Sequence, residues 1–270
     1  MGRLTKAIER IQSRDFDYNM VSEDRAIKME SKSKVDEGKD LFNLEIPLTQ
    51  LDQEHLATRR IVTTEVDPSV RTAYKMLRTR ILQTMRTNGW SSLAITSAGQ
   101  GDGKTLTAIN LAISLAGDVN HHVCLVDLDM KRSSVAKYLG LEPEQGISNV
   151  LKNESKLKNI IVKPNIERLF VIPNVTVEDQ TSELLSSPEM RHTASQLIQN
   201  PNRIIIYDMP PILAADEMLA FSPYVDAILV VVAEGITPRT DAMKVRELLA
   251  DMNVIGTLLN RSDEKTAAYY

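Results

Sequence analysis

The chain has 270 residues, of which 43% are hydrophobic and 25% are charged, so it can bury a globular core. Its 32 basic and 36 acidic residues give a formal net charge of -4, which excludes a polycationic protein that grips nucleic acid or anionic lipid. The single cysteine, Cys124, excludes a disulfide framework and a cysteine zinc cluster. The most apolar run, Ala227–Ala233, is far shorter than the about 20 residues of a membrane-spanning helix. We therefore expect a cytoplasmic chain that does not itself cross a bilayer.

The first 60 residues are predicted to be a largely flexible extension. A short amphipathic helix is indicated by four apolar residues at helical spacing, Leu4, Ala7, Ile8 and Ile11. From Asp15 to about Leu44 the sequence is charged and has no sustained period, which is typical of a linker. The sequence thus predicts an extension over residues 1–60, a main domain over residues 61–263 and a tail over residues 264–270.

A basic amphipathic helix is predicted at the start of the main domain. Between Pro68 and Gly101 the charged side chains are all basic, namely Arg71, Lys75, Arg78, Arg80 and Arg86. One helical face is apolar, with Val70, Tyr74, Leu77, Ile81 and Met85. The pattern fits both a solvated outer face and a face that binds a partner or phosphate.

After this helix, short apolar runs alternate with helical stretches. The runs, which are predicted to be buried strands, are Leu93–Thr96, Val123–Val126, Leu169–Ile172, Ile204–Tyr207, Ile228–Val232 and Val254–Leu259. Helical spacing is found over Leu106–Leu115, Ser187–Ile198 and Thr240–Met252. This alternation predicts an α/β fold with a doubly wound, mainly parallel sheet flanked by helices. In such sheets ligands bind beyond the carboxyl ends of the strands.

A glycine-rich loop follows the first of these strands and leads into a helix. Its glycines allow backbone N–H groups to converge on phosphate oxygens at the positive end of the helix. The Lys104 ammonium is expected to reach the outer phosphates, and the Thr105 hydroxyl to bind magnesium. A glycine turn without a ligand is the alternative, but the flanking strand and helix favour nucleotide binding. The predicted nucleotide-binding residues are Gly99, Gln100, Gly101, Asp102, Gly103, Lys104, Thr105 and Leu106.

Three aspartates follow two other predicted strands. Asp127 and Asp129 come after Val123–Val126, where one carboxylate could bind magnesium and the other accept a proton from an attacking hydroxyl. A solvated acidic turn is the alternative for this pair. Asp208 ends the strand Ile204–Tyr207, where phosphate-loop enzymes place a magnesium-holding acid.

The loop after the last predicted strand is ambiguous. Asn260 and Arg261 open the run Asn-Arg-Ser-Asp, which ends at Asp263. Asn260 could contact an adenine edge, or the run could act like the Asn-Lys-x-Asp element with which GTPases recognise guanine. A terminal loop of this composition also occurs without any ligand.

These motifs together resemble those of the cytoplasmic bacterial tyrosine kinases of exopolysaccharide and capsule synthesis, over about Arg71 to Arg261. The matching segments are TSAGQGDGKTLTAINLA as Walker A, VCLVDLDMKRSS as the second acidic motif, called Walker A′, and IIIYDMPPIL as Walker B. The resemblance implies an ATP- and Mg²⁺-dependent P-loop kinase. By this resemblance Lys104 and Thr105 bind phosphates and magnesium, Asp127 is the catalytic base, and Asp129 and Asp208 organise the metal.

The resemblance also implies partners and a substrate. A homo-oligomer is expected, with a separate membrane chain-length-determinant protein as activator and Tyr269 and Tyr270 as candidate phosphoacceptors. The family's acidic-x-x-Arg-x-x-Arg oligomerisation pattern here reads Thr72, Lys75 and Arg78, so its acidic member is missing. Lys131 stands where the second acidic motif normally has arginine.

Three other functions are alternatives to a kinase that phosphorylates its own tyrosines. A switch ATPase of the chromosome-partitioning or septum-placement type usually carries a second lysine early in the phosphate loop, and that place is Gly99 here. A GTPase is supported only by the run that begins at Asn260. A pseudoenzyme is disfavoured because all the expected lysine, threonine and aspartate side chains are present.

Overall fold

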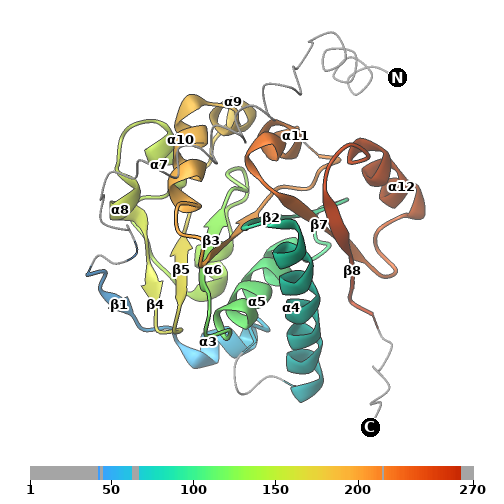
Figure 1. Ribbon diagram of the computed structural model, residues 1–270, viewed down its shortest axis with the longest axis horizontal. Helices are drawn as coiled ribbons and strands as arrows, with labels where there is room; N and C mark the ends of the chain where they lie inside the picture. The colour runs from blue at the N-terminus through green and yellow to red at the C-terminus, as the bar shows by residue number, and fades with distance from the viewer. Residues whose placement is uncertain (1–41, 43–44, 63–66, 215, 263–270) are drawn as a thin grey trace. The chain divides into compact units, whose positions relative to one another are not determined.

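The computed structural model describes residue 42 and residues 45–62, 67–214 and 216–262 (Figure 1). The chain divides into two units, Met1–Asn43 and Leu44–Tyr270, and everything below concerns the second unit. The predicted helix near residues 4–11 and the tail over residues 264–270 lie outside the described residues.

A six-stranded sheet, in the order β5-β3-β6-β2-β7-β8, forms the centre of this unit. All neighbouring strands pair in parallel, and the chain leaves the interior strand β2 toward both edges, so the sheet is doubly wound as predicted. The strands are β2 (Ser92–Ser97), β3 (His122–Asp127), β5 (Leu169–Ile172), β6 (Arg203–Asp208), β7 (Ala227–Ala233) and β8 (Val254–Asn260). Each contains the run from which it was predicted.

Helices cover both faces of this sheet. On one face, α4 (Pro68–Asn88) and α5 (Lys104–Ala116) pack side by side, and their apolar residues join alternate strand positions in one buried cluster (Figure 1). On the other face, the Tyr207 ring of β6 lies edge-on to Phe221 of α11 (Glu217–Phe221), with their centroids 4.7 Å apart. Near-complete burial on both faces explains why the sequences of β2, β3, β5, β6 and β7 are continuously apolar, whereas the edge strand β8 is only partly buried.

The remaining elements are mostly short. Two longer helices, α10 (Pro188–Leu197) and α12 (Arg239–Leu248), match predicted helical stretches. A small parallel sheet pairs β1 (Leu48–Thr49) with β4 (Lys163–Pro164). The short helices are α3 (Gln53–Thr58), α6 (Val135–Leu139), α7 (Ile147–Leu151), α8 (Leu157–Ile160), α9 (Thr181–Leu185) and the 3₁₀ turn η3 (Ser222–Tyr224). None of these was predicted, because one or two turns are too short to show a helical period.

The main unit begins earlier than the boundary predicted near residue 60. Leu56 and Ile61 are fully buried in the same apolar cluster as the sheet. The Asn110 side chain on α5 accepts a hydrogen bond from the backbone N–H of Val62 (2.8 Å) and donates one to the carbonyl of Arg60 (3.1 Å). Residues 45–62 therefore belong to the main unit, since their apolar side chains complete its core.

The predicted basic helix is present as α4. Asp67 caps its start by accepting a hydrogen bond from the Ser69 N–H (2.8 Å), and Gly89 ends it with a φ of 67°. Ile81 is buried, and Arg78 donates a hydrogen bond to the carbonyl of Ser114 on α5 (3.0 Å). Among the described residues, no helix is both long and apolar enough to span a membrane.

Candidate active site

Three loops with candidate functional residues meet at the carboxyl edge of the sheet. Strand β6 lies between β2 and β3 in the sheet, and Asp208 at the end of β6 pairs in register with Asp127 at the end of β3. The loop that follows β2 leads into α5, whose first residues are Lys104 and Thr105. Parallel pairing thus brings together side chains that are more than 100 residues apart in the sequence.

The phosphate loop adopts a backbone conformation that requires glycine. Gly101 and Gly103 have φ angles of 84° and 96°, in the left-handed region. A Cβ atom on Gly103 would also lie only 2.0 Å from the Nδ2 atom of Asn260. Gly103 is the N-cap of α5 and no side chain caps this helix, which suits the binding of an anion at its N-terminus.

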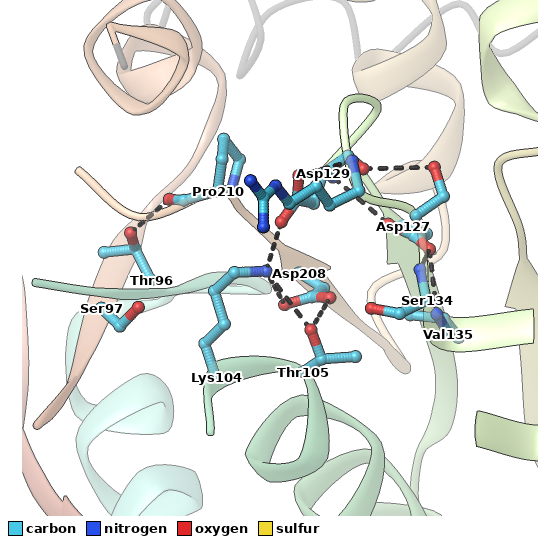
Figure 2. A network of polar contacts seen from close by, with 12 residues as sticks. Thr96, Ser97, Lys104, Thr105, Asp127, Asp129, Ser134, Val135, Asp208 and Pro210 are labelled. Carbon is cyan, nitrogen blue, oxygen red and sulfur yellow. Dashed lines mark hydrogen bonds and ion pairs between the residues drawn. The ribbon is translucent and has the colours of Figure 1, made fainter. Parts of the chain in front are cut away.

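Lys104 lies among the aspartates of the other two loops. Its Nζ atom is 2.7 Å from Oδ2 of Asp129 and 3.4 Å from Oδ1 of Asp208. The Thr105 hydroxyl donates a hydrogen bond to Oδ2 of Asp208 at 2.7 Å (Figure 2). All four of these side chains are buried, so their electrostatic interactions are only weakly screened by water.

Asp127 is held by the backbone of its own loop (Figure 2). Its Oδ2 atom accepts hydrogen bonds from the N–H groups of Ser134 and Val135, both at 3.0 Å, and Oδ1 accepts one from the N–H of Asp129 at 3.2 Å. Val135 is the first residue of α6, so the carboxylate also lies at a helix N-terminus. The side chain is fully buried and fixed in orientation.

The shared burial of these charges changes their pKa values. Burial, reinforced by the charge of Asp208, raises the pKa of Asp127 to about 8 despite the N–H groups that favour its ionised form. Burial also raises the pKa of Asp208, although Lys104 and Thr105 oppose this effect. For Lys104, burial lowers the pKa, but the carboxylates of Asp208 and Asp129 outweigh it and raise the pKa overall. Perturbed values of this kind are typical of functional sites.

The residues present fit a magnesium ion that is bound together with a nucleotide. Thr105 and Asp208 supply a hydroxyl and a carboxylate oxygen within hydrogen-bond distance of each other. Magnesium usually takes one or two carboxylates and completes its shell with water and phosphate oxygens. The part of the chain that the structure describes contains no group of three or more His, Cys, Asp or Glu side chains arranged to hold a metal alone.

Three residues predicted to bind nucleotide make hydrogen bonds within or to the phosphate loop. Asp102 accepts hydrogen bonds from the Gly99 N–H and the Thr237 hydroxyl, both at 2.9 Å. Asn260 donates a hydrogen bond to the carbonyl of Asp102 (2.8 Å), and Arg261 donates one to the carbonyl of Gly101 (2.9 Å). These side chains stabilise the backbone of the phosphate loop through hydrogen bonds. Of the other predicted residues, Gln100 is exposed and Leu106 is half-buried against the core.

Two residues that the sequence analysis did not single out also shape the site. Thr237, in the loop after β7, accepts a hydrogen bond from the Ala233 N–H (2.8 Å) besides its bond to Asp102. Thr96 on β2 donates a hydrogen bond to the carbonyl of Pro210 (2.7 Å) and so joins the loops after β2 and β6 (Figure 2). Both residues lie near the carboxyl ends of predicted strands, and this position in the sequence could have identified them as candidate site residues.

Comparison with known proteins identifies related chains. The family model described as an AAA domain matches residues 91–258. The tyrosine-protein kinase YwqD of Bacillus subtilis strain 168 is 30% identical over 189 residues, which cover 69% of this chain and 79% of the relative.

Two solved structures share the fold. The kinase domain of the Escherichia coli tyrosine kinase ETK has a TM-score of 0.67 at 23% identity and covers 88% of this chain and 98% of that domain. The septum site-determining protein MinD of Pyrococcus horikoshii OT3, complexed with Mg-ADP, has a TM-score of 0.54 at 22% identity and covers 64% and 72% of the two chains. With the phosphate loop and the acidic motifs in place, the chain shares its fold with MinD and belongs to the bacterial tyrosine-protein kinases.

Proposed function

We propose that this chain is an ATP- and Mg²⁺-dependent protein-tyrosine kinase that phosphorylates copies of itself and regulates the synthesis and export of exopolysaccharide or capsule. The observation that carries the proposal is the contact of Lys104 with two carboxylates from separate loops, Asp129 and Asp208. A buried lysine beside a helix N-terminus and a pair of acids can bind phosphate and metal in one place. The names of curated relatives, among them the tyrosine-protein kinase CpsD of Streptococcus agalactiae, support the same activity.

Each side chain has a role that follows from its position. Lys104 binds the outer phosphates of ATP and neutralises charge that develops on the transferred group. Asp127 accepts the proton of the tyrosine hydroxyl, and its pKa near 8 suits a base that works close to neutral pH. The phenolate oxygen then bonds to the terminal phosphorus as the bond to the leaving ADP oxygen breaks. Thr105, Asp129 and Asp208 hold the magnesium ion, which when bound supplies charge neutralisation and alignment of the phosphates.

The substrate and partners of this kinase are part of the proposal. Tyr269 and Tyr270, which lie outside the described residues, are the proposed phosphoacceptors, presented by a neighbouring copy in a homo-oligomer. A membrane chain-length-determinant protein is the proposed activator, and it would hold the kinase at the inner face of the cell membrane. The resemblance of the sequence motifs to those of the capsule kinases supports these assignments.

Mass spectrometry of the purified chain tests the proposal directly. The protein is incubated with Mg²⁺ and ATP, beside the Lys104→Met variant and beside a sample with GTP. We expect added phosphate on Tyr269 or Tyr270 in the wild type with ATP only. Nucleotide consumption without any gain of mass on tyrosine would instead favour the switch ATPase, or a GTPase if GTP is preferred.

A further inference from the structure

One ion pair connects the loop that carries Asp127 and Asp129 to a different part of the fold. The Nζ atom of Lys131 lies 2.7 Å from Oε1 of Glu217, the first residue of α11. The Lys131 side chain is 45% exposed, whereas that of Glu217 is 1% exposed. The loop after β3 is therefore joined to the segment that follows Asp208, although the two are far apart in the sequence.

The environment of Glu217 shows that burial of this ion pair carries a cost in free energy. Its Oε1 atom accepts the Thr181 hydroxyl as well as the Lys131 ammonium, while its Oε2 atom is buried without a hydrogen-bond partner. A buried carboxylate with one unsatisfied oxygen carries a desolvation penalty. Apolar side chains of similar volume often replace such pairs without loss of stability. Stability alone is thus a weak reason for this arrangement.

The loop itself is attached at several places around Lys131. The Ser133 hydroxyl accepts a hydrogen bond from Nδ2 of Asn174 (2.7 Å), in the segment after β5. The N–H of Arg132 donates to Oδ1 of Asp129 (3.2 Å), whose other oxygen contacts Lys104. The backbone next to Lys131 therefore holds one oxygen of Asp129, and a shift of this backbone would move that carboxylate relative to Lys104.

We propose that Lys131 and Glu217 are positioning residues, which fix the loop after β3 so that Asp127 and Asp129 face the phosphate site. Within the described residues, the ion pair joins Lys131 to Glu217 and not to the phosphate loop, so the pair acts on the geometry of the carboxylates and leaves nucleotide binding to Lys104 and its loop. The expected effect of the ion pair on turnover rests on the proposed kinase function. The expected effect of the ion pair on the loop does not depend on that function.

Glu217→Gln is the central test variant. The substitution keeps the volume and the hydrogen bond with Thr181 but removes the charge that attracts Lys131, which is exposed enough to be solvated on its own. The double variant Lys131→Met/Glu217→Gln removes both charges and leaves no unpaired ion in the interior. Lys131→Arg keeps the pair. Lys244→Met breaks a more exposed ion pair with Asp241 (3.0 Å) on α12, far from the loop in sequence, and serves as the control for loss of a surface lysine.

Turnover and hydrogen exchange are measured on each variant. We expect kcat for tyrosine phosphorylation to fall about tenfold or more in Glu217→Gln and in the double variant, since small misplacements of catalytic groups are costly. The KM for ATP should stay within about twofold, because the phosphate loop is intact. The amides of Ser134 and Val135, which hold Asp127, should exchange faster. Lys131→Arg and Lys244→Met should behave like the wild type in both measurements.

A purely structural pair would give a different result. The single variant would then melt at a lower temperature, and the double variant would keep both kcat and the slow exchange of Ser134 and Val135, which would overturn the inference. If the wild type transfers no phosphate to tyrosine, the proposed function fails. In that case the amide exchange rates of Ser134 and Val135, together with the rate of ATP hydrolysis, test the positioning role independently of the kinase function.

Discussion

The aspartates at the two ends of the central sheet differ in the charges that surround them. At the amino end, Asp226 precedes β7, and its Oδ2 atom accepts hydrogen bonds from the N–H groups of Ser91 (2.9 Å) and Ser92 (3.0 Å) and from the Ser92 hydroxyl (2.8 Å). These donors are neutral, and no other described carboxylate contacts it. At the carboxyl end, Asp127 and Asp208 are fully buried, end neighbouring strands and repel each other.

This difference separates a structural acid from the two acids that we propose to be functional. A carboxylate whose oxygens are satisfied by neutral donors can stabilise the turn around it. Carboxylates that share one buried site raise each other's pKa and destabilise the fold until a cation joins them. Proteins accept such conflicts mainly where chemistry is carried out. The predictions below test this contrast.

Removal of Lys104 should have the largest effect. The Lys104→Met variant loses the cation that contacts Asp129 and Asp208 and the side chain proposed to neutralise the transferred phosphoryl group. We expect tyrosine phosphorylation, measured by mass spectrometry, to fall about 10³-fold. Thermal unfolding should also occur at a lower temperature, because buried acids lose their counter-charge. Transfer within tenfold of the wild type would remove Lys104 from the mechanism.

Neutralisation of Asp208 should lower the kinase activity but raise the thermal stability. In Asp208→Asn, we expect magnesium-dependent phosphorylation to fall about 10²-fold, since the proposed metal ligand is weakened. The melting temperature should rise, because the like charge that raises the pKa of Asp127 is gone. Kinase assays over a range of Mg²⁺ concentrations and calorimetry test both effects. A variant with normal magnesium dependence would contradict the assigned role.

The raised pKa of Asp127 predicts how stability changes with pH. The unfolded chain has the ordinary value of 3.8, whereas the folded value is about 8, so the folded state binds the proton more tightly. The stabilisation is complete below the unfolded pKa and is lost as the pH rises to about 8. Asp127→Asn should lack this loss, which melting curves between pH 4 and 8 would show as a smaller decline than in the wild type. Parallel curves for the two proteins would disprove the assignment.

At the amino end, Asp226→Asn should affect stability only. The amide keeps an acceptor oxygen but cannot satisfy all the donors of Ser91 and Ser92, so we expect a loss of about 1–3 kcal/mol in the free energy of unfolding. Urea denaturation measures this loss. The kcat for tyrosine phosphorylation should match that of the wild type, since the residue lies at the opposite end of the strands. A clear loss of kcat would remove the distinction between the two ends.

Much of this arrangement was predictable from the sequence because hydrophobic periodicity is a local property of each segment. The apolar runs predicted all six main strands, and the rule that ligands bind at carboxyl ends placed Lys104, Asp127 and Asp208 in one site. Sequence spacing could not show that Asp102 turns inward or that Asn260 contacts the loop. These contacts depend on residues more than 100 positions away, and no local pattern encodes them.

The boundary near residue 60 was predicted from composition, and it was placed too late for a similar reason. A charged segment suggests a linker, but it gives no sign of whether the next few apolar residues enter a core. Leu56 and Ile61 do enter it, beside α5 and the sheet. Their burial is a property of the packed domain that their own short segment does not reveal.

The brace formed by Asn260 and Arg261 has a consequence for protein synthesis. The phosphate loop is translated about 160 residues before the side chains that hold its Gly101 and Asp102 carbonyls. While the chain is still on the ribosome, the loop exists without this support, and β8 has not yet joined the sheet. The contacts that Asn260 and Arg261 make with the phosphate loop can therefore form only after β8 has been synthesised.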